Sequence, residues 1–245
     1  MINFAEMWKR LEKYLKVDNA LEQGFSNGKY TKELAKYAKH VTGIDLSMDF
    51  LEMAKENLAN CSNVELLIMD AEKMQFEDKS FDVLLNTSFH EFDLSGDIYS
   101  VDLELKRRIL KEMVRVSNCI IFVEPTENAV TNELFKVFNP NENHSDRIYQ
   151  SNSLIADFVK EQGYVLVESG LTFNKDTFAT QKDLENEMLD WWSDIKVPQN
   201  DEEKEEMIKQ IDSILEKAGM LQDLYVTEEI GFKVYKKGEE NGSIS

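Results

Sequence analysis

The sequence is poor in the residues that cross-link or break a chain, with two cysteines and three prolines among 245 residues. Neither Cys61 nor Cys119 belongs to a C-x-x-C pair, so we expect no disulfide framework and no cysteine zinc site. The longest apolar run, 119–123, is far shorter than the ~20 residues that cross a bilayer. The charged, amphipathic start also lacks a secretory apolar stretch. We therefore expect a cytoplasmic protein with no membrane partner.

Basic residues are scarce as well. The chain has 28 Lys and Arg against 47 Asp and Glu, a net charge of −19. Such a chain repels phosphate backbones, so we expect no nucleic-acid partner. A small neutral or cationic ligand stays compatible with this charge, although the charge by itself could serve only to keep a globular protein soluble. Apolar residues make up 42% of the chain, which is enough for a packed core.

Short apolar runs alternate with amphipathic stretches, and each type of segment has its own period. Strands are predicted over 19–23, 40–45, 64–69, 81–85, 119–124, 164–173 and 224–235, and helices over 3–16, 28–39, 48–60, 100–117 and 151–162. This alternation predicts an α/β, Rossmann-like fold, with a mostly parallel seven-stranded sheet and helices on both faces. Ligands of such sheets bind beyond the carboxyl ends of the strands.

One segment, 181–219, interrupts the alternation before the last strand with two predicted helices. Within 181–216 there are 12 acidic and 4 basic residues, and Trp191 and Trp192 lie in the first helix. The segment is either a solvated helical hairpin or a helical cap over a substrate pocket. We expect one domain over 1–236 that contains this cap, followed by a flexible tail at 237–245.

Polar or glycine residues follow four successive predicted strands. Gly24, Asp45, Asp70 and Asn86 stand at these strand ends, and Asp45 comes 21 residues after Gly24. A carboxylate at that distance can accept both hydroxyls of a ribose, so together these positions predict a site for an adenosine-type cofactor.

The glycine turn argues against a dinucleotide. Residues 24–28 read G-x-S-x-G rather than G-x-G-x-x-G. Glu22 lies beside the turn, where its carboxylate would repel a pyrophosphate but would suit an ammonium or a sulfonium.

The order of these motifs resembles that of the class I S-adenosylmethionine-dependent methyltransferases. Residues 21–28 resemble their glycine-rich first motif, 41–47 the motif with the ribose-binding acid, 68–72 the adenine-binding turn and 80–86 the fourth-strand motif. The resemblance implies S-adenosylmethionine as cofactor, S-adenosylhomocysteine as product and seven cofactor-binding residues. Glu22, Gly24 and Asn86 would lie at the methionine part, Asp45 at the ribose, and Leu46, Asp70 and Ala71 at the adenine.

Two departures from the family pattern bear on which branch of these methyltransferases the sequence resembles. Ser26 replaces the middle glycine of the first motif, and 86–89 lack both prolines of the methyltransferases that act on amino groups of nucleic acids. The resemblance is therefore to the branch that methylates small molecules. Rival hypotheses are a non-catalytic binding protein of the same fold and a nicotinamide-dependent oxidoreductase.

Histidines supply the candidates for chemistry. His90 follows the fourth strand and is the predicted catalytic residue, as a general base for a protonated acceptor, with Glu91 as a second candidate. His144 lies in a polar stretch and is expected to be solvated, with the pocket as an alternative. The alternative for His90 is a purely structural role, because alignment alone can drive methyl transfer. No sequence cluster has metal-ligand spacing, so we expect no metal site. Several aromatic residues could form an acceptor pocket or pack in the core: Phe89, Phe92, Tyr149, Phe173, Trp191 and Trp192.

Overall fold

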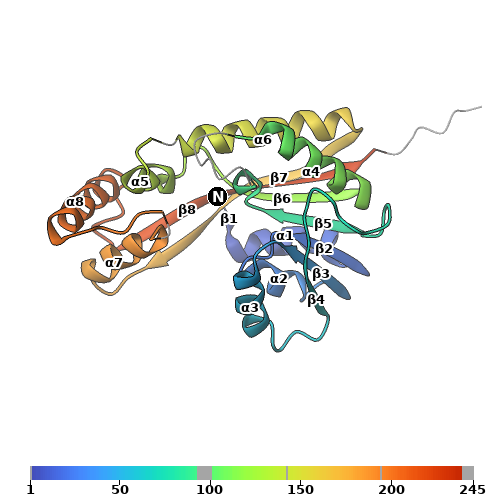
Figure 1. Cartoon of the computed structure of the whole chain (residues 1–245), viewed down its shortest axis with the longest axis horizontal. Helices are drawn as coiled ribbons and strands as arrows, with labels where there is room; N and C mark the ends of the chain where they lie inside the picture. The colour runs from blue at the N-terminus through green and yellow to red at the C-terminus, as the bar shows by residue number, and fades with distance from the viewer. Residues whose placement is uncertain (1, 93–100, 142, 194, 239–245) are drawn as a thin grey trace, which may run out of the picture.

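The computed structural model describes residues 2–92, 101–141, 143–193 and 195–238, and shows one twisted sheet between layers of helices (Figure 1). The strand order is β1-β7-β8-β6-β5-β2-β3-β4. The strands are β1 (Ile2–Asn3), β2 (Asn19–Gln23), β3 (His40–Asp45), β4 (Val64–Ile68), β5 (Val83–Thr87), β6 (Cys119–Pro125), β7 (Tyr164–Thr177) and β8 (Tyr225–Lys237). The predicted seven-stranded sheet is confirmed, and the two-residue β1 adds a short edge strand parallel to β7.

Within the described ranges, β8 is antiparallel to β6 and β7, and the other paired strands are parallel. The central strands β5 and β6 are buried almost throughout. Their near-continuous apolar sequences follow from this burial, because helices cover the sheet on both sides.

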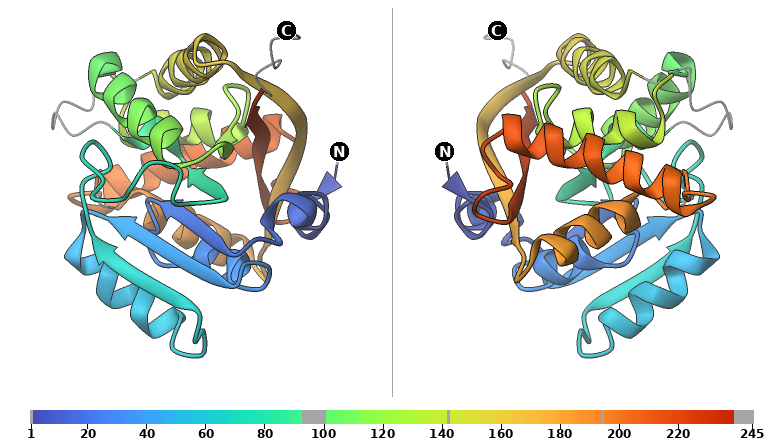
Figure 2. Two further views of the ribbon diagram at one scale, coloured as in Figure 1. Left: turned by 90° about the vertical axis from the view of Figure 1, so that its right-hand side faces the viewer. Right: turned by 90° about the vertical axis from the view of Figure 1, so that its left-hand side faces the viewer.

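Helices pack on both faces of the sheet (Figure 2). One face is covered by α4 (Leu103–Val116) and α6 (His144–Glu161), whose apolar residues share a core with Leu21 and Ile120. The other face carries α1 (Phe4–Leu15), α2 (Lys29–Leu34) and α3 (Met48–Asn57). The alternate residues of each strand supply the two cores, since successive side chains of a strand point to opposite faces.

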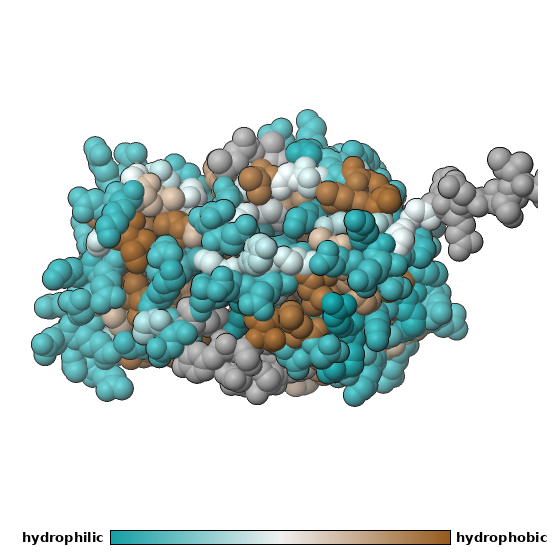
Figure 3. Space-filling model, turned by 90° about the horizontal axis from the view of Figure 1, so that it is seen from above, coloured by the Kyte–Doolittle hydropathy of each residue, from teal (hydrophilic) through white to brown (hydrophobic). Residues whose placement is uncertain are grey.

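Two helices occupy the predicted cap segment, α7 (Gln181–Trp191) and α8 (Asp201–Lys217). They lie at the far end of the long β7–β8 ribbon, together with α5 (Val130–Phe138), a helix that the sequence did not predict (Figure 1). Apolar residues of these three helices form a core of their own, which includes Leu134, Met188 and Ile211. Seen from above, this end of the molecule is covered mostly by hydrophilic side chains, as expected for its acidic sequence (Figure 3).

The ends of two other elements differ from the prediction. Helix α6 begins at His144, seven residues before the predicted start, because Asn143 caps it by accepting a hydrogen bond from the Asp146 N–H. Strand β8 continues to Lys237, and residues 239–245 of the predicted tail lie outside the described residues. No helix in the described ranges is both long and apolar enough to cross a membrane.

Candidate functional site

A cavity of about 590 Å³ opens at the carboxyl ends of β2, β3, β4 and β5. Five of the seven residues predicted to bind the cofactor line it: Gly24, Asp45, Leu46, Asp70 and Ala71. Glu22 and Asn86 are fully buried and do not belong to the lining. The strand-end argument thus brings most of the predicted residues together, while these two lie behind the cavity wall.

The glycine-rich turn after β2 forms one wall of this cavity. Gly24 and Gly28 both have φ of +81°, a left-handed conformation that favours glycine. A Cβ at Gly24 would also lie 2.9 Å from the Phe92 ring. Ser26, which replaces the family's middle glycine, adopts the left-handed region too, with φ of +47°. The serine therefore keeps a glycine-like backbone at a cost in strain.

Asp45 holds this turn against the end of β3. Its Oδ2 accepts a hydrogen bond from the Ser26 N–H at 3.0 Å, and its Oδ1 accepts one from the Ser47 N–H at 3.0 Å. Each carboxylate oxygen has further lone pairs. Asp45 can therefore accept ligand hydroxyls while it keeps both backbone contacts.

Another part of the lining is apolar and exposed. Leu46 and Phe50 line the cavity with 47% and 40% of their surface exposed, an unusual degree of exposure for large apolar side chains. Asp70 accepts the Glu72 N–H on Oδ1 at 2.8 Å, beside the buried Ala71. An apolar wall next to a carboxylate suits a flat ring that carries an amino group, such as adenine.

Gln23 is a lining residue that sequence reasoning missed. Its side chain is fully buried, and its Oε1 accepts a 2.9 Å hydrogen bond from Asn86 Nδ2. Its Nε2 has no hydrogen-bond partner among the described residues. A buried donor in that state costs stability until a ligand acceptor satisfies it. The observation fits a cofactor that presents an oxygen at this wall.

Glu22 lies directly before Gln23, and its two carboxyl oxygens lack hydrogen-bond partners among the described residues. Burial raises the pKa of Glu22 to about 8, and the nearby negative charge of Asp45 acts in the same direction. At neutral pH the carboxyl group is therefore largely protonated. A neutral carboxyl group outside the cavity lining does not support the expected direct contact between Glu22 and the cofactor ammonium.

A second, smaller cavity of about 250 Å³ lies next to the first, beneath the cap. The two cavities share Ser88 and Glu91. The smaller one is lined by Ser88, His90, Glu91, Pro125, Thr131, Asn132, His144, Trp191, Trp192 and Glu228. The cap therefore contributes both tryptophans to this pocket, which favours the cap interpretation over a solvated hairpin.

His90 is buried between two carboxylates. Its Nδ1 lies 2.7 Å from Glu124 Oε2, and its Nε2 lies 2.9 Å from Glu91 Oε1. Burial opposes a charge on the ring, but the hydrogen bonds to Glu124 and Glu91 prevail and raise the pKa of His90 to about 9. A protonated imidazole with both nitrogens engaged cannot accept a proton. This arrangement argues against the predicted general-base role.

Glu124 was not singled out from the sequence, although it ends the apolar strand β6. Besides the His90 ring, its carboxylate accepts hydrogen bonds from the backbone N–H groups of Phe89 and His90. It thereby fixes the short helix η1 (Phe89–Glu91) at the junction of the two cavities. An acid at the end of a buried strand was the available signal, and it is the same signal that identified Asp45.

His144 is buried rather than solvated, with 12% of its side chain exposed. Its ring stacks on Phe135, with a centroid distance of 4.7 Å, and lies edge-on to His90 at 5.1 Å. Burial, reinforced by the nearby His90 charge, lowers the pKa of His144 to about 4. The start of α6 thus places a neutral imidazole in the smaller cavity, which corrects the expectation of solvation.

A buried lysine binds the backbone of the turn at the junction of the two cavities. Lys106 on α4 is fully buried, and its Nζ donates to the carbonyl oxygens of Phe89 at 2.8 Å and His90 at 3.0 Å. It also reaches the Phe92 carbonyl at 3.4 Å. Because the turn is held from Glu124 on one side and Lys106 on the other, the side chains at the junction are preorganised.

The predicted aromatic residues divide between the cavities and the core. Trp191 and Trp192 line the smaller cavity and Phe92 the larger one. Phe89 belongs to the sheet core, while Tyr149 and Phe173 line neither cavity. Both alternatives, a pocket and packing elsewhere, thus apply to different members of this aromatic set.

Comparison with known proteins agrees with this geometry. Residues 21–118 match the family model described as a methyltransferase domain. Demethylmenaquinone methyltransferases from Staphylococcus aureus strains JH9 and Newman are 42% identical over 66 residues, which are 26% of this chain and 27% of theirs. The match thus spans about a quarter of the length of these curated relatives.

Solved structures resemble the chain over nearly its whole length. A candidate methyltransferase from Bacillus halodurans C-125 aligns with a TM-score of 0.63 and 17% identity over 96% of this chain and 98% of that one. The N-methyltransferase NodS from Bradyrhizobium japonicum WM9, in complex with S-adenosylhomocysteine, aligns with a TM-score of 0.51 and 12% identity over 96% of this chain and 87% of that one. The cyclase SpnF aligns with a TM-score of 0.52 and 12% identity over 96% of this chain and 83% of that one.

At these identities the structural likeness shows the fold alone. The domain match covers the glycine-rich turn and the strand ends that line the larger cavity. Residues 21–118 thus match a methyltransferase domain, and the chain shares its fold with solved methyltransferase structures over nearly its whole length.

Proposed function

We propose that this protein transfers a methyl group from S-adenosylmethionine to a small-molecule acceptor and releases S-adenosylhomocysteine. The observation that carries the proposal is the contact between the two cavities at Ser88 and Glu91. A cofactor in the larger cavity and an acceptor in the smaller one would meet at this junction.

The larger cavity offers the donors and acceptors that the cofactor requires. Asp45 would accept the ribose hydroxyls, Leu46 would lie against the adenine, and Asp70 with Ala71 would bind its amino edge. Gly24 would face the methionine part, together with Gln23 Nε2, which lacks a hydrogen-bond partner in the part of the chain that the structure describes. We assign Glu22 and Asn86 an indirect role, because both are buried outside the lining and Asn86 hydrogen-bonds the lining residue Gln23.

The charge of the lining also favours a sulfonium. Three carboxylates, Asp45, Asp70 and Glu91, line the larger cavity against one lysine, Lys29. Such a surface attracts a cationic ligand and repels a pyrophosphate. This balance disfavours the nicotinamide oxidoreductase hypothesis.

The smaller cavity supports a small acceptor rather than a polymer. It lies beneath the cap, and its size admits only a compact group. The negative charge of the chain further disfavours nucleic acid as acceptor. The two free cysteines support a reducing, cytoplasmic location.

The reaction is an in-line displacement. A lone pair of the acceptor attacks the methyl carbon while the sulfur takes the electron pair of the breaking C–S bond. Alignment of the reacting atoms contributes ~7–11 kcal/mol in favourable cases, and exclusion of water by the cap adds to it. Because both ring nitrogens of His90 contact carboxylates, we propose that His90 orients Glu91 at the junction instead of removing a proton.

Turnover with labelled cofactor tests this function. The protein would be incubated with methyl-labelled S-adenosylmethionine and a panel of hydroxyl, amine and thiol acceptors, and the label would be followed into product. Asp45→Ala should abolish transfer, whereas the control Asp157→Ala, at an exposed position on α6, should retain it. Cofactor binding without transfer to any acceptor would favour the non-catalytic binding protein instead.

A further inference from the structure

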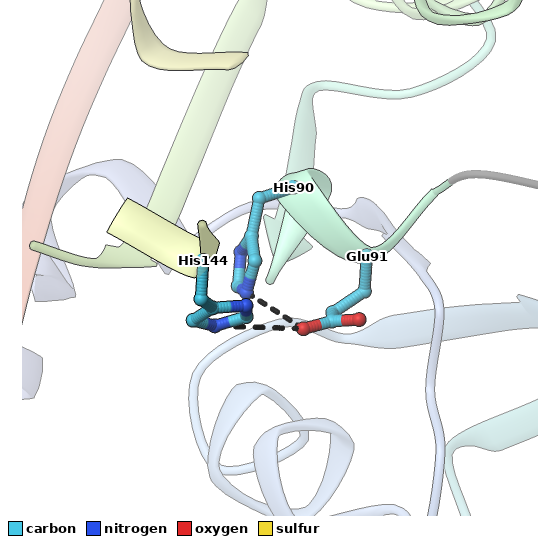
Figure 4. Close-up of side chains that lie close together, drawn as sticks. All are labelled: His90, Glu91 and His144. Carbon is cyan, nitrogen blue, oxygen red and sulfur yellow. Dashed lines mark ion pairs between the residues drawn. The ribbon is translucent and has the colours of Figure 1, made fainter. Parts of the chain in front are cut away.

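Three potential metal ligands converge at the junction of the cavities (Figure 4). His90 and Glu91 come from η1, and His144 begins α6, 54 residues further along the chain than His90. Nε2 of His90 lies 2.9 Å from Glu91 Oε1, and Nε2 of His144 lies 3.9 Å from the same oxygen. One ligand atom from each residue lies within 4.8 Å of the others.

We propose that His90, Glu91 and His144 bind a divalent transition-metal ion of the Zn²⁺ or Fe²⁺ type. Two imidazoles and one carboxylate are a common ligand set for these ions, and such a set leaves coordination positions open for a substrate. Bonds of about 2.1 Å place ligand atoms up to about 4.2 Å apart, so small side-chain rotations would close the site. This proposal departs from the expectation of no metal, which considered only spacing along the sequence.

Neighbouring residues already orient the ligands as a metal site requires. Glu124 Oε2 lies 2.7 Å from Nδ1 of His90, so Nδ1 carries a proton and Nε2 is the atom directed at Glu91. A carboxylate behind the ligating imidazole is the usual outer shell of a metal-bound histidine. Arg147 Nη1 lies 3.7 Å from Glu91 Oε2, the oxygen that points away from the histidines. Phe135 stacks on the His144 ring and fixes its plane.

The charge at the site is suited to a cation. Glu91 and Glu124 flank a single imidazole, so the His90 ring lies between two carboxylates. A metal ion at Nε2 would replace a proton there, as metal binding to histidine generally does. Glu228 lines the same cavity and adds a second carboxyl group, besides that of Glu91, to its wall.

The position of the site suggests what the ion would do, an argument that rests on the proposed function. The three residues line the cavity assigned to the acceptor, and Glu91 also borders the cofactor cavity. A bound ion would coordinate an acceptor hydroxyl and lower its pKa. The hydroxyl proton would pass to solvent, the oxygen lone pair would form the O–CH₃ bond, and sulfur would keep the C–S electrons. The predicted acceptor class is therefore a hydroxyl compound.

Cobalt binding provides a direct test. The full-length protein, freed of metal by a chelator and dialysed, would be titrated with Co²⁺ while the visible absorption of bound Co²⁺ is recorded. We expect one equivalent to bind, Zn²⁺ to displace it, and affinity to fall at least about tenfold in His144→Ala and Glu91→Gln. His40→Ala, at an exposed position that begins β3, is the matched control and should bind as the wild type does.

Two results would overturn the metal site. One is the absence of a Co²⁺ spectrum in the wild type. The other is binding that His144→Ala and Glu91→Gln leave unchanged, which would place the ion elsewhere on the acidic surface. Calorimetry with S-adenosylhomocysteine on the same metal-free samples distinguishes a failure of the metal site from a failure of the proposed function. Cofactor binding without Co²⁺ binding refutes only the metal site, while Co²⁺ binding without cofactor binding refutes only the methyltransferase function.

Discussion

Asp45 Oδ2 accepts a 3.0 Å hydrogen bond from the backbone N–H of Ser26. This contact joins the end of β3 to the glycine-rich turn after β2, and it explains how the turn keeps its shape without its middle glycine. Ser26 adopts a left-handed backbone, with φ of +47°, that glycine would adopt more readily. Asp45 thus has two functions, since it stabilises the turn and also faces the larger cavity.

Ser26→Gly should stabilise the protein, because it removes the left-handed strain of a residue with a side chain. We expect the free energy of unfolding to rise by about 0.5–1 kcal/mol, the strain relieved less the added flexibility of the unfolded chain. Urea unfolding would measure it. Ser62→Gly, at an exposed turn without positive φ, is the control and should lower stability by a similar amount. A loss of stability in Ser26→Gly would show that the turn does not carry this strain.

Lys106→Met should destabilise the junction between the cavities. The substitution keeps much of the side-chain volume but removes the ammonium that donates to the Phe89 and His90 carbonyls. The Phe89 carbonyl keeps the Phe92 N–H as a donor, whereas the His90 carbonyl loses the ammonium, so the free energy of unfolding should fall by about 1–3 kcal/mol. Lys111→Met, at an exposed position on the same helix, should change it little. Equal stability of the two variants in urea unfolding would contradict this role of Lys106.

Glu22 should make the stability of the ligand-free protein depend on pH. Burial raises the pKa of Glu22 from 4.5 to about 8 in the folded state. Between these two pH values the folded protein keeps a proton that the unfolded chain has already released. The stabilisation is complete below about pH 4.5 and is lost as the pH rises toward 8. Each pKa unit corresponds to about 1.4 kcal/mol, so the loss amounts to a few kcal/mol at most.

Glu22→Gln should remove this dependence, because the amide stays neutral. The difference in unfolding free energy between variant and wild type should grow in favour of the variant between about pH 5 and pH 8. Glu56→Gln, at an exposed position on α3, should follow the wild type throughout. Parallel curves for Glu22→Gln and wild type, measured by urea unfolding at several pH values, would show that Glu22 is ionised in the fold.

Trp192→Ala should affect the acceptor without affecting the cofactor. The Trp192 ring lines the smaller cavity and packs on Phe135 and Phe138 at centroid distances of 5.7 and 5.3 Å. Once an acceptor is found, steady-state kinetics should show its KM raised by at least about tenfold, since a large aromatic contact is lost. Phe173→Ala is the aromatic control, because Phe173 lines neither cavity. A raised KM for S-adenosylmethionine instead would place the acceptor elsewhere.

Much of the fold and part of the site could be predicted from local sequence patterns. The seven strands of the sheet and the two cap helices each leave a periodic apolar signal, and Gly24, Asp45 and Asp70 follow strands at regular places. Their positions could be predicted because the carboxyl ends of parallel strands meet at one edge of the sheet.

The remaining features depend on contacts between distant segments. The early start of α6 lies in a polar stretch, and the apolar side of α5 is buried only by its packing against the cap helices. His144 reaches His90 only through that packing, and no sequence spacing connects them. Glu22 and Asn86 occupy the right strand ends but are buried outside the cavity lining. The Glu22 side chain points to the sheet face opposite that of Gln23, because side chains alternate along a strand, and Asn86 lies beside Gln23 and donates to its amide oxygen.

Calorimetric titration with S-adenosylhomocysteine tests the central claim most directly. The wild type and Asp157→Ala should bind one equivalent with equal affinity. Asp45→Ala should bind more than about tenfold more weakly, because two hydrogen bonds from the ribose to a carboxylate are lost. Thermal unfolding of each sample would verify that the variant remains folded without its Ser26 contact. Absence of binding to the wild type, or equal binding by Asp45→Ala, would contradict the assignment of this cavity to the cofactor.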